Sequence, residues 1–87
     1  MKEENYIKYL ERIKEEGFIR NRSANTIRNY VAIVNAFLRT VDCESVDELT
    51  LLHARNYIIG MRRAGKKPDS CNVVNSALSF FLSEGSS

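Results

Sequence analysis

The side chains best suited to chemistry are basic and polar residues that gather around two expected helix starts, one at Ser23 and one at Pro68. The first group is Arg20, Arg22, Ser23, Asn25, Thr26, Arg28 and Asn29, and the second is Lys66, Lys67, Ser70 and Asn72. Such groups hydrogen-bond to phosphate oxygens, and asparagine can also read adenine edges. If the two helix starts lie side by side, the cations form one patch beside two positive helix ends, which suits phosphates.

The charge of the chain is divided into blocks, although the net charge is only +2. By segment the charge is −1 for residues 1–17, +4 for 18–40, −4 for 41–50, +5 for 51–68 and −2 for 69–87. Two basic blocks therefore flank an acidic connector. The alternative is that the basic residues only form a solvated face, as surface lysines and arginines commonly do, and that Ser23 serves only as a helix cap.

The length of 87 residues is that of one small domain, which we expect to span residues 1–87 and which disfavours most enzymes. A hydrophobic content of 44% and a charged content of 28% are typical of a folded chain. Cys43 and Cys71 lie far apart without metal-ligand spacing, so we expect no metal, no cofactor and a reducing compartment. No apolar run approaches the roughly 20 residues that span a bilayer, so we expect no membrane partner.

Apolar spacing and capping residues predict an all-α domain of four short helices. The expected helices run from Lys2 to Glu16 with Gly17 as a left-handed end, from a Ser23 cap to Arg39 or Thr40, from a Thr50 cap to Ala64 and Gly65, and onward from Pro68. Residues 18–22 form the first connection. The acidic connector 41–49 has room for one short helical turn.

Each expected helix carries one apolar stripe that would face the core. The stripes are Tyr6, Tyr9, Leu10 and Ile13; Ile27, Tyr30, Val31, Val34 and Leu38 with Phe37; Ala54, Tyr57, Ile58 and Met61; and Cys71, Val74, Leu78 and Phe81 with Ala77 and Phe80. All four tyrosines fall on these stripes, which favours a packing role over a nucleophilic one. His53 has no carboxylate or cysteine at a suggestive spacing, so we interpret it as a surface or capping residue.

Several motifs occur in an order that resembles a known family. They are Ser23–Tyr30, Phe37–Leu38, Asp47–Thr50, Tyr57–Ile58, Met61, Gly65, Pro68, Ser70–Asn72, Ser76–Leu78 and Phe80–Phe81. This set resembles the N-terminal core-binding domain of tyrosine recombinases, the phage-integrase SAM-like domain, over nearly the whole chain. The chain departs from the family at Val73 and Val74, where many relatives have basic residues, and at Asn75, where leucine is usual.

The resemblance implies a SAM-like four-helix bundle with orthogonal packing, which forms one half of a clamp around recombination-site DNA. The second and fourth helices would face the duplex. Matching positions near the DNA are Ser23, Thr26, Arg28, Asn29, Ser70 and Asn72, with Lys66 and Lys67 just before the fourth helix. In this family the catalytic tyrosine and its basic helpers lie in a separate C-terminal domain, so the resemblance implies no catalytic residue here.

The implied partners are double-stranded DNA, the C-terminal catalytic domain of the same parent chain, and other recombinase protomers in a synaptic complex. The implied location is the cytoplasm of a prokaryotic cell, with the gene on a phage or another mobile element.

Two alternatives remain open. The first is a helical interaction or oligomerisation module whose binding face is Ile33, Ile59 and Val73. The second is a helix-turn-helix regulator, although no second helix begins with a cluster of base-reading side chains.

Overall fold

Four α-helices account for most of the computed structural model, which describes residues 1–85. The helices are α1 (Ile7–Ile19), α2 (Ala24–Thr40), α3 (Leu51–Arg63) and α4 (Pro68–Phe80). Three short turns accompany them: η1 (Glu3–Asn5), η2 (Val46–Glu48) and η3 (Phe81–Gly85). No strand occurs among residues 1–85, which confirms the all-α prediction. Of the expected 1–87 domain, residues 86 and 87 lie outside the described part.

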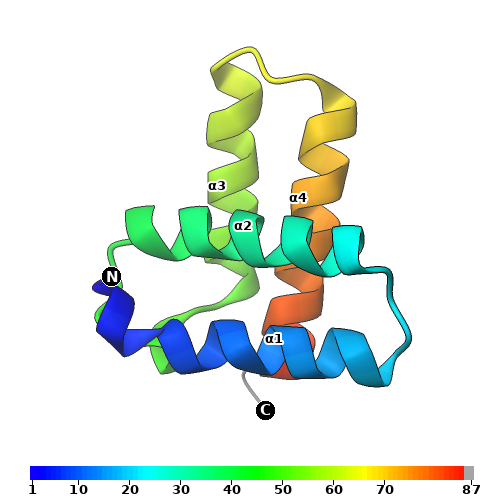
Figure 1. Ribbon diagram of the computed structural model, residues 1–87. Coiled ribbons are helices and arrows are strands. Elements are labelled where there is room, and N and C mark those ends of the chain that lie inside the picture. The colour runs from blue at the N-terminus through cyan, green and yellow to red at the C-terminus, as the bar shows by residue number, and fades with distance from the viewer. Residues whose placement is uncertain (86–87) are drawn as a thin grey trace.

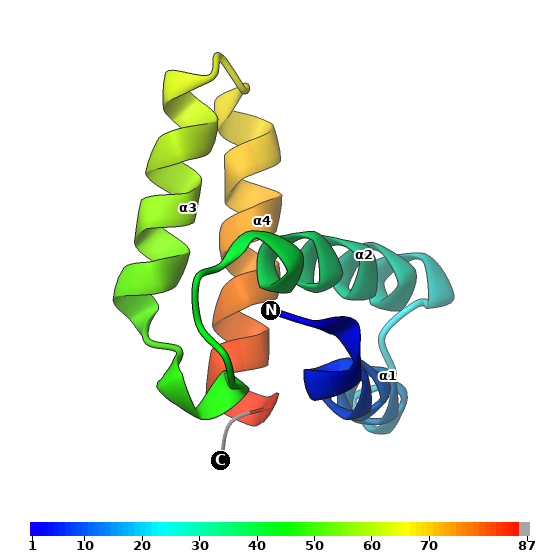
Figure 2. The same ribbon diagram turned by 90° about the vertical axis from the view of Figure 1, so that its left-hand side faces the viewer.

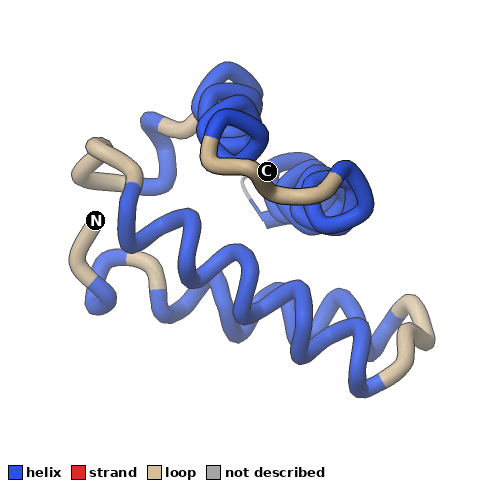
Figure 3. Tube along the Cα trace, turned by 90° about the horizontal axis from the view of Figure 1, so that it is seen from above, coloured by secondary structure: helices blue, strands red, loops and turns tan. Residues whose placement is uncertain are grey.

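The helices form two antiparallel hairpins, and α1 and α2 run across α3 and α4 (Figure 1). Seen from the side and from above, the α1–α2 hairpin lies against one side of the α3–α4 hairpin (Figures 2 and 3). The free end of the second hairpin, where α3 passes into α4, projects beyond α2 in Figures 1 and 2. This crossed packing matches the expected orthogonal bundle. The antiparallel α1–α2 pair differs from a helix-turn-helix, whose two helices meet at about 90–120°.

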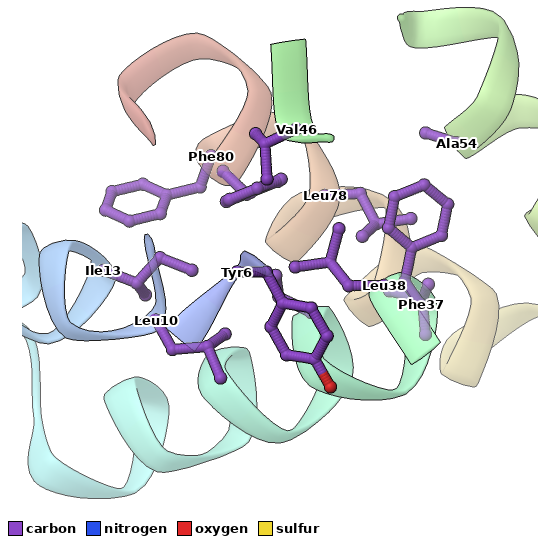
Figure 4. Close-up of a cluster of buried hydrophobic side chains, with 12 residues drawn as sticks. Tyr6, Leu10, Ile13, Phe37, Leu38, Val46, Ala54, Leu78 and Phe80 are labelled. Atoms are coloured by element: carbon purple, nitrogen blue, oxygen red, sulfur yellow. The ribbon is translucent and has the colours of Figure 1, made fainter. Parts of the chain in front are cut away.

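The core lies where the hairpins cross (Figure 4). Side chains from all four helices and from η2 and η3 meet there, together with Tyr6 between η1 and α1. The fully buried ones include Tyr6, Phe37, Leu38, Leu78 and Phe81. The expected stripes of all four helices contribute, although Ile27, Tyr30 and Val31 are only partly buried. The Tyr6 hydroxyl donates to Asn35 Oδ1 at 2.7 Å, so even the most buried hydroxyl has a partner.

The starts of α2 and α4 and the end of α3 lie where the capping residues of the sequence predict them. The Ser23 hydroxyl accepts a hydrogen bond from the Thr26 amide at 3.1 Å, and Pro68 opens α4. Gly65, with φ +91°, follows α3. The amides of Gly65 and Lys66 there donate to the carbonyls of Arg62 and Met61, which is the pattern of a Schellman motif.

Gly17 does not end α1, which corrects the first expected helix boundary. The helix continues to Ile19, and the left-handed residue of the following turn is Asn21, with φ 57°. Gly17 is buried, and a Cβ built there would lie 2.6 Å from Ile27 Cγ1. The glycine therefore permits the close approach of α2 to α1 rather than a change of chain direction.

This contact predicts opposite outcomes for two glycine-to-alanine substitutions. Gly17→Ala should lower the free energy of unfolding by about 1 kcal/mol, because the clash with Ile27 outweighs the better helix propensity of alanine. Gly60→Ala, in α3, should raise it by about 0.5–1 kcal/mol, since nothing lies within 4 Å of its Cβ position. Urea unfolding of both variants measures the difference. A stabilised Gly17→Ala variant would contradict the packing described for α1 and α2.

The acidic connector folds back onto the start of α3. It contains the single predicted turn, η2, whose Val46 is buried in the core. His53 Nδ1 accepts from the Thr50 amide at 3.0 Å, so His53 is a capping residue as predicted. His53 also contacts a cysteine that the spacing in the sequence does not suggest, since Cys43 Sγ lies 3.4 Å from His53 Nε2. The reason is the fold of the connector, which a spacing of ten residues does not reveal.

Candidate nucleic-acid interface

The basic residues form two clusters instead of the single patch that the sequence suggested. The starts of α2 and α4 lie well apart in both side views (Figures 1 and 2). The N-terminal half of α2 packs against the end of α4 instead, since the rings of Tyr30 and Phe80 lie with their centroids 5.7 Å apart. Since α4 has 13 residues, its two ends are separated by about 20 Å.

The first cluster, here called the turn cluster, consists of Arg20 and Arg22 at the α1–α2 turn. The Arg22 guanidinium carbon lies 5.2 Å from the ring centroid of Phe80 and 5.7 Å from that of Tyr30. The Arg20 guanidinium carbon lies 5.5 Å from the Phe80 centroid. All three distances are within the range of cation–π attraction. Arg20 also pairs with the exposed Glu16 carboxylate at 3.9 Å.

The second cluster, here called the tip cluster, consists of Arg62, Arg63, Lys66 and Lys67 at the projecting α3–α4 turn. All four side chains are exposed. The Schellman motif fixes the backbone, and Arg62 Nη1 donates to the Lys66 carbonyl oxygen at 2.9 Å. Within the described residues, none of the four forms an ion pair with a carboxylate. Uncompensated exposed cations on a rigid turn attract anions.

The polar residues predicted at the start of α2 divide into two kinds. The Ser23 hydroxyl accepts a hydrogen bond from the Thr26 amide and donates one to the Thr26 hydroxyl oxygen at 2.9 Å. Asn25 and Asn29 are exposed. The Ser23 hydroxyl is thus engaged in capping the helix, whereas the Asn25 and Asn29 side chains are exposed to solvent.

Arg28 and Asn72 line two separate grooves. Arg28 lines the groove between α1 and α2 together with Lys14 and Phe18, on the side of α2 away from the tip. The expectation that Arg28 shares a surface with Lys67 is therefore wrong, because α1 and the tip lie on opposite sides of α2. Asn72 lines a groove of about 370 Å³ between α3 and α4, beside Arg55.

Ser70, in the first turn of α4, is exposed near the tip cluster. Of the departures from the family pattern, Val73 is exposed on α4, whereas Val74 is buried in the core. The buried position explains an apolar residue at 74.

The exposed apolar residues agree only in part with those expected. Ile59 and Val73 are exposed, at 39% and 47%, whereas Ile33 is partly buried and packs against the core. The most exposed large apolar side chains are instead Phe18, Ile19, Leu51 and Leu52, at 82%, 73%, 70% and 63% exposure. The sequence reasoning missed Phe18 and Ile19 because it ended the first helix at Gly17.

Two further features bear on the type of site. No helix of the described residues is long and apolar enough to cross a membrane. Among the same residues, no three histidine, cysteine, aspartate or glutamate side chains gather where they could hold a metal ion.

The comparison with protein families decides the classification. The family model described as phage integrase, N-terminal SAM-like domain, matches residues 9–86. The chain belongs to this family. Comparison with curated proteins and comparison with solved structures give no match. The match makes the chain a domain of an integrase, which is a type of recombinase. Its crossed four-helix bundle agrees with the SAM-like fold of that family.

Proposed function

We propose that this integrase domain binds duplex DNA mainly through phosphates and holds it for a catalytic domain elsewhere in the parent protein. The observation that carries the proposal is the pair of cation clusters at the two ends of α4. The tip cluster supplies four cations without carboxylate partners among the described residues, and the turn cluster supplies two arginines next to the start of α2.

The spacing of the clusters suits a duplex. The separation of about 20 Å along α4 exceeds the width of the major groove, about 12 Å, so the two clusters can reach phosphates on either side of it. The exposed α4 residues between the clusters include Ser70, Val73 and Ser76, which offer short hydroxyls and an apolar surface. We therefore expect contacts to phosphates to dominate over base recognition.

The surroundings of the four tyrosines argue against a role for them in DNA cleavage. Burial, and secondarily the nearby Glu3 carboxylate, raise the pKa of Tyr6, although Arg39 opposes the shift. A buried phenol with a raised pKa and a hydrogen-bond partner is a poor nucleophile. Tyr9, Tyr30 and Tyr57 pack against the core. We propose that the parent's catalytic domain supplies the nucleophile and that this chain contributes no catalytic residue.

Protein contacts form the second part of the proposal. The exposed Phe18 and Ile19 at the end of α1, and Leu51 and Leu52 at the start of α3, are apolar surfaces available to other proteins. We propose that they serve the contacts with the catalytic domain or with other protomers in the synaptic complex, in the cytoplasm where the DNA lies.

The test is an equilibrium titration of a fluorescent generic duplex with the 87-residue chain at 50 mM salt. The proposal predicts saturable binding that weakens as salt is added. A duplex whose anisotropy does not change at 50 mM salt would overturn it.

A further inference from the structure

We infer that copies of this chain associate head to tail, with the end of α1 of one copy seated in the groove between α3 and α4 of the next. The inference rests on the proposed function, whose protein contacts it narrows to a second copy of this chain. The two surfaces share no lining residue, so each copy can offer one of them and accept the other.

The first surface is a ridge at the end of α1, formed by Glu15, Phe18 and Ile19. These residues have the i, i+3 and i+4 spacing that places side chains on one face of a helix. Phe18 and Ile19 are the two most exposed large apolar side chains among the described residues. Glu15 is exposed and forms no ion pair within residues 1–85, whereas Lys14 beside it is paired with Glu11 at 3.1 Å. The ridge is therefore apolar and carries one uncompensated carboxylate.

The second surface is the groove of about 370 Å³ between α3 and α4, which run side by side (Figure 2). Its charged lining residue is Arg55, which is exposed and has no carboxylate partner in the described part of the chain. No carboxylate lines the groove. The apolar lining residues are Leu51, Ala54, Ile58, Ile59 and Cys71. The groove is therefore apolar and carries one uncompensated guanidinium group.

The charges favour a ridge paired with a groove. Two paired ridges would each carry the Glu15 carboxylate, and two paired grooves would each carry the Arg55 guanidinium group, so neither of these symmetrical contacts joins opposite charges. A ridge in a groove places Glu15 of one copy near Arg55 of the next, which is electrostatically complementary. The same contact covers the exposed apolar side chains of both surfaces, whereas a symmetrical contact leaves those of one surface in water.

The contact should be weak between free copies. Two apolar side chains that enter one groove cover well under the roughly 1,000 Å² of a lasting interface. We therefore expect a Kd of roughly 0.1–1 mM. Copies bound to neighbouring stretches of one duplex would meet at a higher effective concentration. Because a head-to-tail contact repeats from copy to copy, it would give successive copies the same direction along the DNA.

A complementation experiment without DNA tests the inference on the 87-residue chain. Phe18→Ser removes the ridge, and Leu51→Ser/Arg55→Glu alters the groove; all three side chains are exposed. Sedimentation equilibrium at about 1 mM should show self-association of the unaltered chain, weakened roughly fivefold or more in each variant. An equimolar mixture of the two variants should associate again and stop at dimers, because each variant retains the surface that the other has lost.

Leu52→Ser/Arg63→Glu is the matched control for the groove variant. Leu52 is 63% exposed, close to the 70% of Leu51, and Arg63 is an exposed arginine of the same helix, but neither lines the groove. This variant should associate within about twofold of the unaltered chain, since exposed positions outside a contact change binding little. Equal losses in the control and the groove variant would overturn the inference.

Two further results would also overturn it. The first is an unaltered chain that stays monomeric at about 1 mM. The second is a groove variant that associates as strongly as the unaltered chain while Phe18→Ser does not, because this is the result of a symmetrical contact in which Phe18 enters the groove beside Arg28.

If a serine variant does not fold, single charge reversals decide. Glu15→Lys and Arg55→Glu each change one exposed side chain. Each should weaken self-association, and their equimolar mixture should recover it, because opposite charges then meet in both kinds of contact. A mixture that associates no more than the separate variants would overturn the inference. A chain that binds duplex DNA but does not self-associate would overturn this inference alone, whereas a chain that self-associates but does not bind DNA would overturn the proposed DNA binding.

Discussion

Phe37→Ala should lower the free energy of unfolding by about 3–5 kcal/mol, the range for removing a buried aromatic side chain. Phe37 is 1% exposed, and its ring meets Tyr57 edge-on with the centroids 5.2 Å apart. It joins α2 to α3, so the substitution leaves a cavity where the two hairpins cross. A domain of this size has a total stability of the same order, so we expect much of the variant to be unfolded at room temperature. Urea unfolding followed by circular dichroism measures this.

Phe18→Ala is the control, because it removes the same side chain from a position that is 82% exposed. Its unfolding free energy should change by less than about 0.5 kcal/mol. Comparable losses for Phe18→Ala and Phe37→Ala would mean that the core has been placed wrongly.

Reversing two charges in the tip cluster should have the largest effect on DNA binding. Lys66→Glu/Lys67→Glu removes two cations from an exposed turn and places two anions where phosphates are expected. The loss of two contacts together with the new repulsion should weaken binding roughly 10- to 100-fold at 50 mM salt. Stability should hardly change, since both side chains are exposed and neither forms an ion pair within the described chain. Fluorescence anisotropy with a generic duplex and a thermal melt provide the two measurements.

Lys2→Glu/Lys8→Glu is the control for net charge, because it changes the net charge by the same amount as Lys66→Glu/Lys67→Glu but at a different place on the surface. Lys2 and Lys8 are exposed near the N-terminal end of α1, which lies on the other side of α2 from the tip. This variant should lose only a small part of the affinity through long-range electrostatics. Equal losses in the two double variants would show that the tip is not the contact surface.

The helix boundaries could be predicted where a local signal determines them. Ser23, Gly65 and Pro68 act through hydrogen bonds and backbone angles within a few residues, so the sequence pattern alone locates them. Gly17 could not be predicted in this way. A glycine at that spacing is equally compatible with a helix end and with a close helix crossing, and only its contact with Ile27, ten residues away, decides.

The positions of the candidate site residues depend even more on tertiary contacts. The charge blocks show where the cations lie along the chain. Which end of α4 lies near α2 depends instead on the packing of Tyr30 on Phe80, which are fifty residues apart in the sequence. Neighbouring residues on a helix point about 100° apart. The sequence alone does not show which of these directions faces α1, so it could not predict that Arg28 lies in the groove between α1 and α2. The sequence therefore locates the basic and polar residues along the chain, but it does not predict the grouping of the cations into two clusters.

The salt dependence of duplex binding tests the central claim most directly. The claim is that this integrase domain contacts DNA through the phosphates with its turn and tip clusters. Each phosphate contact releases counterions, so contacts by all the cations of the two clusters predict a slope of log K against log salt of roughly −5 for the 87-residue chain and a generic duplex. A slope near zero, or no binding at 50 mM salt, would contradict the claim.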